Sequence, residues 1–225
     1  QSATGLSARF FAAAATGPSG AGAIAGGSGT GGSAPSVAGT DTGFVVAYAS
    51  AGDVFFQRFT ASGTPSDAMG RNVLTTATGT QDQPAVAALG SGTFMVAWRD
   101  TEGDGAGTAI RAQAFNADGT PRGATVVVNS TAAGDQARPA IAGADARFSI
   151  AFESSGSVRA RIFTDMGGDV LNRESPPSTS DFEVVPTGTA PAVAAVGAGA
   201  SAAWLYAYGA LTDGQGEVFG RPYPR

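Results

Sequence analysis

The chain has 225 residues and a net charge of −5, and it contains 34 glycines and 12 prolines spread between short apolar runs. The acidic balance argues against nucleic acid or anionic lipid as a partner, and no apolar stretch is long enough for a transmembrane helix. The chain contains no Cys or His and all 13 of its cations are Arg, which excludes disulfides, thiolate metal sites, histidine catalysis and Schiff bases.

Residues 5–33 begin with LSARFF and continue through a run of Ala, Gly and Ser that, taken alone, is typical of a linker. The start of this segment nevertheless shares a pattern with four later segments. Each has an aliphatic first residue, an aromatic last residue and a polar residue between them. The five segments are Leu6–Phe11, Val54–Phe59, Ile110–Phe115, Val158–Phe163 and Val218–Tyr223. The alternation predicts a strand at each of them.

A second pattern, Pro-[Ser/Ala]-[Val/Ile]-Ala, occurs four times. The four copies begin at Pro35, Pro84, Pro139 and Pro191. An aromatic residue follows each copy after 13 or 14 residues: Tyr48, Trp98, Phe152 and Trp204. The residues between are mostly small or polar, which predicts a pair of strands joined by a tight turn.

The two patterns alternate along the chain and define a repeat of four strands, which is best preserved in Gln81–Asn129. Four-stranded units at this spacing favour a β-propeller over a β-sandwich or β-solenoid. We therefore predict a single all-β repeat domain over residues 1–225, β-propeller-like, with four or five blades of four-stranded antiparallel sheets. The predicted units are residues 34–80, 81–135, 136–182 and 183–225.

The strand of the first pattern occurs five times and the hairpin of the second only four times, so one strand is left over. Residues 5–33 would then be a partial unit that either completes the last unit and closes a ring or pairs with a neighbouring molecule. Pro222 and Pro224 restrict the C-terminal copy to a sheet edge, because proline cannot donate to the strand ladder.

Gln81–Asn129 resembles a roughly 50-residue repeat of large bacterial secreted and cell-surface proteins. The shared pattern is Gln-x-x-Pro-x-Val-Ala, Gly-x-Phe-Val-Val-x-Trp, and an Ile-x-x-Gln-x-Phe strand closed by Gly-Thr-Pro. Pro35–Thr76 and Gln136–Val170 match it fairly, and both ends of the chain match it weakly. Such repeats occur in adhesin-like, calcium-associated and propeller-like extracellular proteins. The resemblance implies a secreted, cell-surface or periplasmic module, and it implies no reaction.

The most distinctive local motif is Asp100-Thr-Glu102-Gly-Asp104-Gly105. Oxygen ligands at alternating positions before a glycine resemble the start of a calcium loop, so Asp100, Glu102 and Asp104 are candidate metal ligands. Arg111 stands where the chelating Glu of such a loop is expected. A solvated loop joining two strands explains the same motif and is the preferred interpretation.

Two further groups of residues have both a binding and a structural interpretation. Trp98 and Trp204 could form a platform for a sugar, but their repeated position favours core packing. Five polar residues share one position of the first pattern: Arg9, Gln57, Gln113, Arg161 and Arg221. They could line a channel, although hydrogen bonds to the backbone of a neighbouring blade are preferred. Asn129-Ser-Thr131 matches a glycosylation acceptor triplet.

These observations favour a non-enzymatic extracellular structural or adhesive module that binds protein partners or self-associates through an unpaired terminal strand. The alternative is a carbohydrate-binding, lectin-like propeller. A glycoside hydrolase that works with carboxylates alone is a third interpretation, but no Asp or Glu pair stands out for it. No cofactor other than calcium is expected.

Overall fold

The computed structural model describes residues 7–8, 22–23, 32–74, 78–166, 168, 179–196, 203–212 and 215–224. These residues form strands, turns and loops, and the strands make four antiparallel sheets of three or four strands. The prediction of an all-β fold is confirmed. Within this part of the chain there is no helix that could cross a membrane.

Each sheet is built from strands that follow one another in the chain. Blade 1 contains β3 (Ser33–Thr40), β4 (Gly43–Ser50), β5 (Asp53–Thr60) and β6 (Arg71–Asn72). Blade 2 contains β7 (Gln81–Ala88), β8 (Phe94–Asp100), β9 (Ala109–Phe115) and β10 (Val126–Val127). Blade 3 contains β11 (Gln136–Ala144), β12 (Arg147–Ser154), β13 (Ser157–Thr164) and β14 (Phe182–Val185). Blade 4 contains β15 (Thr189–Val196), β16 (Ala203–Thr212) and β17 (Gln215–Pro224).

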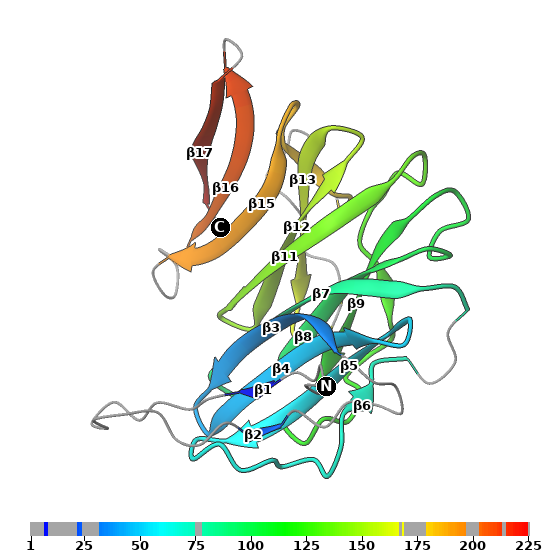
Figure 1. Ribbon diagram of the computed structural model, residues 1–225. Helices are drawn as coiled ribbons and strands as arrows, with labels where there is room; N and C mark the ends of the chain where they lie inside the picture. The colour runs from blue at the N-terminus through cyan, green and yellow to red at the C-terminus, as the bar shows by residue number, and fades with distance from the viewer. Residues whose placement is uncertain are drawn as a thin grey trace.

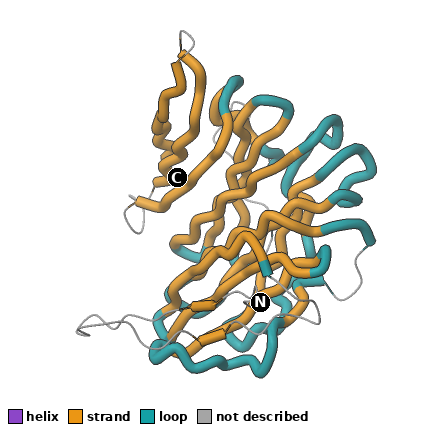
Figure 2. The backbone as a smooth tube through the Cα atoms, viewed as in Figure 1, coloured by secondary structure: helices purple, strands orange, loops and turns teal. Residues whose placement is uncertain are grey.

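The four blades fan out from their first strands (Figure 1). β3, β7, β11 and β15 lie on the inner side of the fan, and each packs against the next. Figure 2 shows that most of the described loops and turns lie at the ends of the strands. This is the arrangement of a β-propeller, so the propeller-like prediction with four blades is confirmed. Blades 1 and 4 lie at opposite ends of the fan, which forms an open arc.

The turns between the second and third strands differ among the blades. In blades 1 and 3 two residues with positive φ make this turn, Ala51-Gly52 and Ser155-Gly156. Positive φ at both positions defines the type I′ turn, which matches the twist of a hairpin. Blade 2 instead has an eight-residue connection, 101–108, between β8 and β9. The acidic motif therefore lies mostly in an insertion, not in the repeated framework.

Each pair of neighbouring blades packs an aromatic face against a face of smaller side chains. We call the face toward the preceding blade the leading face and the face toward the following blade the trailing face. The leading face of blade 3 carries Phe148, Ile150, Phe152 and Phe163. They pack on the trailing face of blade 2, formed by Ala87, Met95, Ala97, Ile110, Ala112 and Ala114. Large rings over small side chains allow dense packing between the sheets.

The same rule holds at the other two contacts between blades. The leading face of blade 2 places Phe94, Val96, Trp98 and Phe115 over Val45, Ala47, Val54 and Phe56 of blade 1. The leading face of blade 4 places Trp204 and Tyr206 over Ala151, Val158, Ala160 and Ile162 of blade 3. Alternation along each strand therefore gives a leading face rich in aromatic residues and a trailing face of mostly small or aliphatic residues, with Phe56 of blade 1 as the exception.

Backbone hydrogen bonds join the blades at the ends where the first strands begin. In each, an amide just before or at the start of a first strand donates to a carbonyl of the preceding blade. The three bonds are Gln81 N to Gly52 O (2.7 Å), Gln136 N to Thr108 O (3.0 Å) and Gly188 N to Gly156 O (2.9 Å). Their repetition fixes the spacing between neighbouring blades.

The pairing of the terminal strands shows which segment provides the third strand of blade 4. β16 pairs with β17, so the third strand of this blade comes from its own unit. β1 (Ser7–Ala8) pairs with β2 (Gly22–Ala23) in a separate two-stranded sheet. The N-terminal strands are thus not the partner of β16. The described residues provide no fourth strand for blade 4.

The pairing in blade 4 corrects one detail of the predicted repeat. Ala85, which follows Pro84, pairs with Ala97, so Trp98 comes directly after the paired residue. Ala192, at the corresponding place in blade 4, pairs with Ala207 and not with Ala203. The residue equivalent to Trp98 is therefore Tyr208. Trp204 lies four positions earlier, where the other blades have Phe44, Phe94 and Phe148.

Candidate functional site

An unusual backbone conformation recurs at the start of every first strand. The residue before the repeated proline has positive φ in all four blades: Ala34 (49°), Gln83 (50°), Arg138 (51°) and Ala190 (49°). The strand pairing shifts by one residue at the same four places, so each is a β-bulge.

These bulges are strained positions. A side chain in the left-handed region approaches the following carbonyl oxygen, at a cost of roughly 1–2 kcal/mol for a residue other than glycine. The following proline restricts the preceding residue further, toward extended conformations. Strain of this kind persists only where the surrounding structure imposes it, and it clusters at functional sites. The positive-φ residues at the start of the first strands therefore indicate a candidate functional site.

Side chains of the preceding blade hold the bulges of blades 3 and 4. The backbone amide of Arg138 donates to Oε1 of Gln83, the bulge residue of blade 2, at 2.7 Å. The backbone amide of Ala190 donates to Oε1 of Glu153, on β12 of blade 3, at 2.6 Å. Two bulge amides are thus satisfied across the space between blades.

Two ion pairs flank these hydrogen bonds. Nε and Nη2 of Arg99 donate to the two carboxylate oxygens of Asp82, at 2.7 and 2.5 Å. Nη1 of Arg138 lies 2.8 Å from each carboxylate oxygen of Glu153. The side chain of Arg138 is 60% exposed, whereas that of Glu153 is 15% exposed. We call Asp82, Gln83, Arg99, Arg138 and Glu153 the mouth cluster.

Electrostatics reinforce the mouth cluster at Arg99. The hydrogen bond with Asp82 raises the pKa of Arg99 above its ordinary value, while partial burial acts in the opposite direction. The negative charges of Asp82 and, more distantly, Asp135 also raise this pKa. The guanidinium is therefore permanently charged and fixed by a paired, planar contact with the carboxylate.

The acidic loop does not bring its three acids together. Oδ1 of Asp100 accepts from the backbone amide of Glu102 at 2.9 Å, and Oδ2 lies 3.3 Å from Nη1 of Arg111. Asp104 accepts from the amide of Ala106 (3.1 Å) and from the side chain of Asn129 (2.7 Å). Among the described residues, no three acidic, His or Cys side chains form a group that could hold a metal ion. The three carboxylates therefore make separate contacts in this structure, and the calcium loop stays a prediction.

Asn129, the residue of the glycosylation triplet, is buried at 6% exposure. Its Oδ1 accepts from the amide of Ile110 at 2.9 Å. Its Nδ2 donates to Asp104 and, at 3.0 Å, to the carbonyl of Thr131. The side chain therefore closes the acidic loop onto blade 2 and is not presented for modification.

The polar residues at the shared third-strand position act in two ways. Nη1 of Arg161 donates to the carbonyls of Val127 and Val128 in the preceding blade, at 3.2 and 3.0 Å. Nη1 of Arg221 donates to the carbonyl of Val184, also in the preceding blade. For these two arginines the preferred interpretation, hydrogen bonding to a neighbouring blade, is confirmed.

The two glutamines at this position each bond to a loop of their own blade. Nε2 of Gln57 donates to the carbonyl of Asp67 (3.1 Å), and Nε2 of Gln113 donates to that of Gly123 (3.1 Å). For Gln113 the prediction of a contact between blades was wrong. Each amide instead reaches the loop that follows its strand. Arg9 lies outside the described residues.

Both tryptophans are fully buried, with 0% exposure. The structural interpretation is confirmed, since Trp98 lies in the core between blades 1 and 2 and Trp204 in the core between blades 3 and 4. Neither ring can serve as an exposed platform for a sugar.

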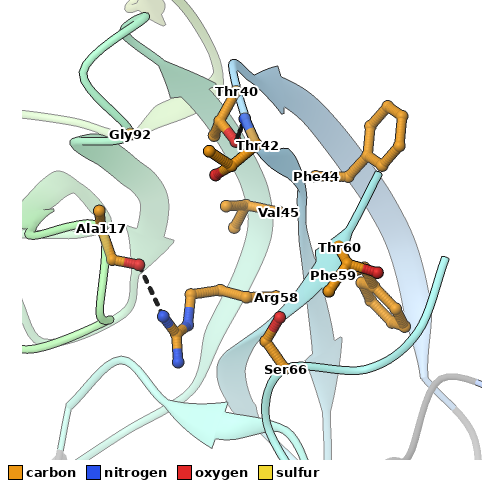
Figure 3. A pocket seen from close by; sticks show the side chains of 10 residues that line it. All are labelled: Thr40, Thr42, Phe44, Val45, Arg58, Phe59, Thr60, Ser66, Gly92 and Ala117. Carbon is orange, nitrogen blue, oxygen red and sulfur yellow. Dashed lines mark hydrogen bonds between the residues drawn. The ribbon is translucent and has the colours of Figure 1, made fainter. Parts of the chain in front are cut away.

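A cavity of about 220 Å³ opens between blades 1 and 2, at the end opposite the mouth cluster. Figure 3 shows Thr40, Thr42 and Phe44 on one side of it and Ala117 on the other. Its one charged side chain, Arg58, donates to the carbonyl of Ala117 at 2.6 Å. The cavity is smaller than the roughly 300–1,000 Å³ of typical small-molecule sites.

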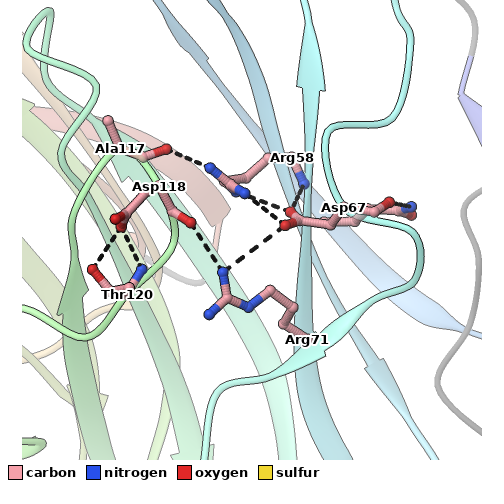
Figure 4. A network of polar contacts seen from close by, with 7 residues as sticks. Arg58, Asp67, Arg71, Ala117, Asp118 and Thr120 are labelled. Atoms are coloured by element: carbon pink, nitrogen blue, oxygen red, sulfur yellow. Dashed lines mark hydrogen bonds and ion pairs between the residues drawn. The ribbon is translucent and has the colours of Figure 1, made fainter.

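Arg58 and Arg71 form a clasp between blade 1 and the loop after β9 (Figure 4). Arg58 makes an ion pair with the buried Asp67 at 2.6 Å, and Arg71 donates to the carbonyl of Asp118 at 3.0 Å. Hydrogen bonds from the side chain and backbone of Thr120 lower the pKa of Asp118, and the charges of Arg58 and Arg71 act in the same direction. Both guanidinium groups already bond to protein groups, so we interpret the clasp as a contact that stabilises the packing of blade 1 on blade 2.

The mouth cluster was not anticipated from the sequence. The repeated proline marks each unit in the sequence, but the residue before it belongs to neither repeated pattern. A usable signal existed in blades 2 and 3, where that residue is the polar Gln83 or Arg138, while blades 1 and 4 have Ala34 and Ala190. The mouth cluster accordingly draws all its members from blades 2 and 3.

Comparison with family models gives no match, and comparison with curated proteins gives none either. Solved structures do resemble this fold. A chain described as phage phi92 endosialidase matches with a TM-score of 0.55 and 11% identity, over 87% of this chain and 36% of that one. A glycoside hydrolase matches with a TM-score of 0.49 and 9% identity, over 85% of this chain and 46% of that one. An endo-arabinase from Bacteroides thetaiotaomicron matches at 0.43 and 10%, over 85% of this chain and 74% of that one.

At these identities the likeness is one of fold. The chain spans about a third of the length of the endosialidase chain and less than half that of the glycoside hydrolase. The likeness to the endosialidase chain, at a TM-score of 0.55, supports the propeller architecture derived from the strand pairing, and it assigns no activity.

Proposed function

We propose that this chain is a non-enzymatic, extracellular structural or adhesive module whose contact surface is the mouth cluster. The observation that carries this proposal is the strained bulge of blades 2 and 3, which displays Gln83 and Arg138 beside two ion pairs. A polar surface that is already held in place loses little conformational entropy when a partner binds. Backbone strain that persists at a surface is often found where the strained residues bind a ligand or partner.

The contacts of the two acids support a non-enzymatic role. Both oxygens of Asp82 accept hydrogen bonds from Arg99, and both oxygens of Glu153 accept from Arg138. Hydrolysis of a glycosidic bond ordinarily needs one carboxylic acid to give a proton and a second carboxylate to act as nucleophile or base. Carboxylates held on both oxygens by arginine donors are suited to position neighbouring groups.

The test is to incubate the 225-residue chain with sialylated glycans, arabinan and other polysaccharides and to follow products by mass spectrometry. We expect no cleavage above a heat-inactivated control. Turnover that disappears in the Glu153→Gln variant would contradict the proposal and assign this carboxylate to catalysis.

Carbohydrate binding is the second candidate, and two observations favour it. The fold is shared with a chain described as an endosialidase. The mouth cluster offers planar amide, carboxylate and guanidinium groups, which pair well with the hydroxyl and carboxylate groups of sugars. A glycan array read with the wild-type chain and with Gln83→Ala tests it. Binding that weakens in the variant supports a lectin-like role, whereas an array without a ligand leaves a protein partner as the proposal.

A further inference from the structure

The mouth cluster leaves several hydrogen-bond donors unused. Oε1 of Gln83 accepts from the backbone amide of Arg138 at 2.7 Å, which leaves the two N–H groups of Nε2. Nη1 of Arg138 donates to both carboxylate oxygens of Glu153 at 2.8 Å, which leaves Nε and Nη2. Among the described residues, none of these three nitrogen atoms has a hydrogen-bond partner. A ligand that completes this site is therefore one that accepts hydrogen bonds.

The unused donors of Arg138 form a fork. Nε–H and Nη2–H of a guanidinium point the same way and bind the two oxygens of one carboxylate side by side. Arg99 uses these two atoms for Asp82, at 2.7 and 2.5 Å, and Arg58 uses them for Asp67, at 2.9 and 2.6 Å. In Arg138 the fork is open, and the side chain is 60% exposed. We infer that the mouth cluster binds the carboxylate group of an acidic polysaccharide.

The open fork is held in place by the protein itself. Glu153, which bonds to Nη1 of Arg138, also accepts from the backbone amide of Ala190 at 2.6 Å. The backbone of Arg138 is fixed by its bond to Gln83 and by the bulge, where its φ is 51°. Arg138 is therefore anchored at its amide and at Nη1, while Nε and Nη2 stay open. A ligand that binds such an ordered group loses little affinity to the ordering of side chains.

Neighbouring acids favour an acidic polysaccharide over an acidic peptide. Asp82 and Glu153 belong to the mouth cluster, and Asp135 directly precedes β11, close enough for its charge to act on Arg99. A peptide rich in Asp and Glu would bring many like charges to these three acids, which is unfavourable. An acidic sugar unit carries one carboxylate among several hydroxyl groups, and the hydroxyls can donate to the remaining lone pairs of the acids. This inference rests on the proposed function, because it names the ligand class of the same surface.

The experiment titrates the 225-residue chain with a short galacturonate oligomer and, separately, with the methyl ester of the same oligomer. Nuclear magnetic resonance follows the side-chain signals of Gln83 Nε2 and Arg138 Nε. We expect the acid oligomer to shift both signals. The ester should bind at least about tenfold more weakly, since a hydrogen bond to a charged group is stronger than one to a neutral group.

Two substitutions separate the fork from charge alone and from the shape of the bulge. Arg138→Lys keeps the positive charge and loses the planar fork. Gln83→Glu keeps an oxygen to accept from the amide of Arg138, and it replaces the unused N–H groups by a negative charge. Each should weaken binding of the acid oligomer at least about tenfold. Arg147→Lys, at the start of β12, is the matched control and should leave this affinity unchanged.

The inference is overturned if the acid oligomer shifts neither signal, if the ester binds equally well, or if Arg138→Lys binds like the wild type. Tighter binding of poly-glutamate would replace the polysaccharide by an acidic peptide, and tighter binding of a sulfated oligomer would replace the carboxylate by a sulfate. Failure of the proposed function gives a different result. A neutral glycan or a protein whose binding weakens in Gln83→Ala/Arg138→Ala keeps the mouth cluster as the contact surface and overturns only its preference for carboxylate.

Discussion

The backbone amide of Arg138 donates to the side-chain carbonyl of Gln83, and this 2.7 Å bond joins two left-handed residues on neighbouring blades. Each residue precedes the proline that marks its repeat. The strain of one bulge is thus coupled to the position of the next. This coupling orients the exposed guanidinium of Arg138 beside Glu153 and defines the polar end of the arc.

The strain at the bulges can be measured at Ala190, which has a φ of 49°. Glycine adopts positive φ without a Cβ clash, so Ala190→Gly should be neutral or stabilising by up to about 1 kcal/mol in chemical unfolding. Ala112→Gly, in the buried interior of β9, serves as the control and should lose about 0.5–1 kcal/mol or more. Equal losses in both variants would show that the bulge carries no strain.

Arg161 clamps blade 3 to blade 2 through the carbonyls of Val127 and Val128. Arg161→Gln introduces the residue found at this position in blades 1 and 2, whose shorter amide bonds within its own blade. We expect a loss of about 1.5–3 kcal/mol, the range for hydrogen bonds to a charged group. Hydrogen exchange at the amide of Val128 should accelerate. Arg147→Gln removes another arginine of blade 3, at the start of β12, and should have a smaller effect. Similar losses in both variants would contradict the clamp.

Trp98 fills the core between blades 1 and 2, and no hydrogen-bond partner for its Nε1 is found among the described residues. Trp98→Ala should destabilise the chain by about 3–5 kcal/mol, as large-to-small substitutions in cores do. Trp98→Phe should cost only a fraction of this, because Phe152 fills the same position in blade 3. Denaturant titration of both variants checks the difference. A large loss in Trp98→Phe would indicate that Nε1 has a partner after all.

Stability at acidic pH should depend on Asp118. Its folded-state pKa lies below the ordinary value of 3.8, so folding favours the charged carboxylate. The resulting contribution is complete above the ordinary value and is lost as the pH falls through the lowered pKa. Asp118→Asn should therefore flatten the unfolding free energy below about pH 4. Asp41→Asn, in the exposed turn after β3, is the control, and identical pH profiles of Asp118→Asn and wild type would contradict the assignment.

The propeller architecture could be predicted because it depends on short patterns that recur along the sequence. Alternation identifies the strands, and the repeated proline and aromatic residues identify the units. The left-handed residues could not be predicted, since the residue before a proline ordinarily avoids such a conformation. Gln83 and Arg138 adopt it because the pairing of β7 with β8 and of β11 with β12 requires a bulge there. That requirement is set by partners distant in sequence.

The strand register of blade 4 also could not be predicted, because it depends on pairing between strands. Ala203-Trp204 and Ala207-Tyr208 both fit the repeated pair of alanine and aromatic residue, and only the pairing of Ala192 with Ala207 decides between them. Of the site, the isolation of the acidic loop in one unit was evident from the sequence. The ion pair of Asp82 with Arg99 was not, because it depends on which residues face each other across β7 and β8.

The most direct test of the mouth cluster compares three proteins on a panel of immobilised polysaccharides and extracellular proteins, using label-free binding. They are the wild type, the double variant Gln83→Ala/Arg138→Ala, and Arg147→Ala, which removes one positive charge from the opposite end of blade 3. We expect at least one surface to bind the wild type and Arg147→Ala equally, and the double variant at least about tenfold more weakly. Equal binding by all three proteins, or cleavage of a glycan by the wild type, would contradict a non-enzymatic module that binds through the mouth cluster.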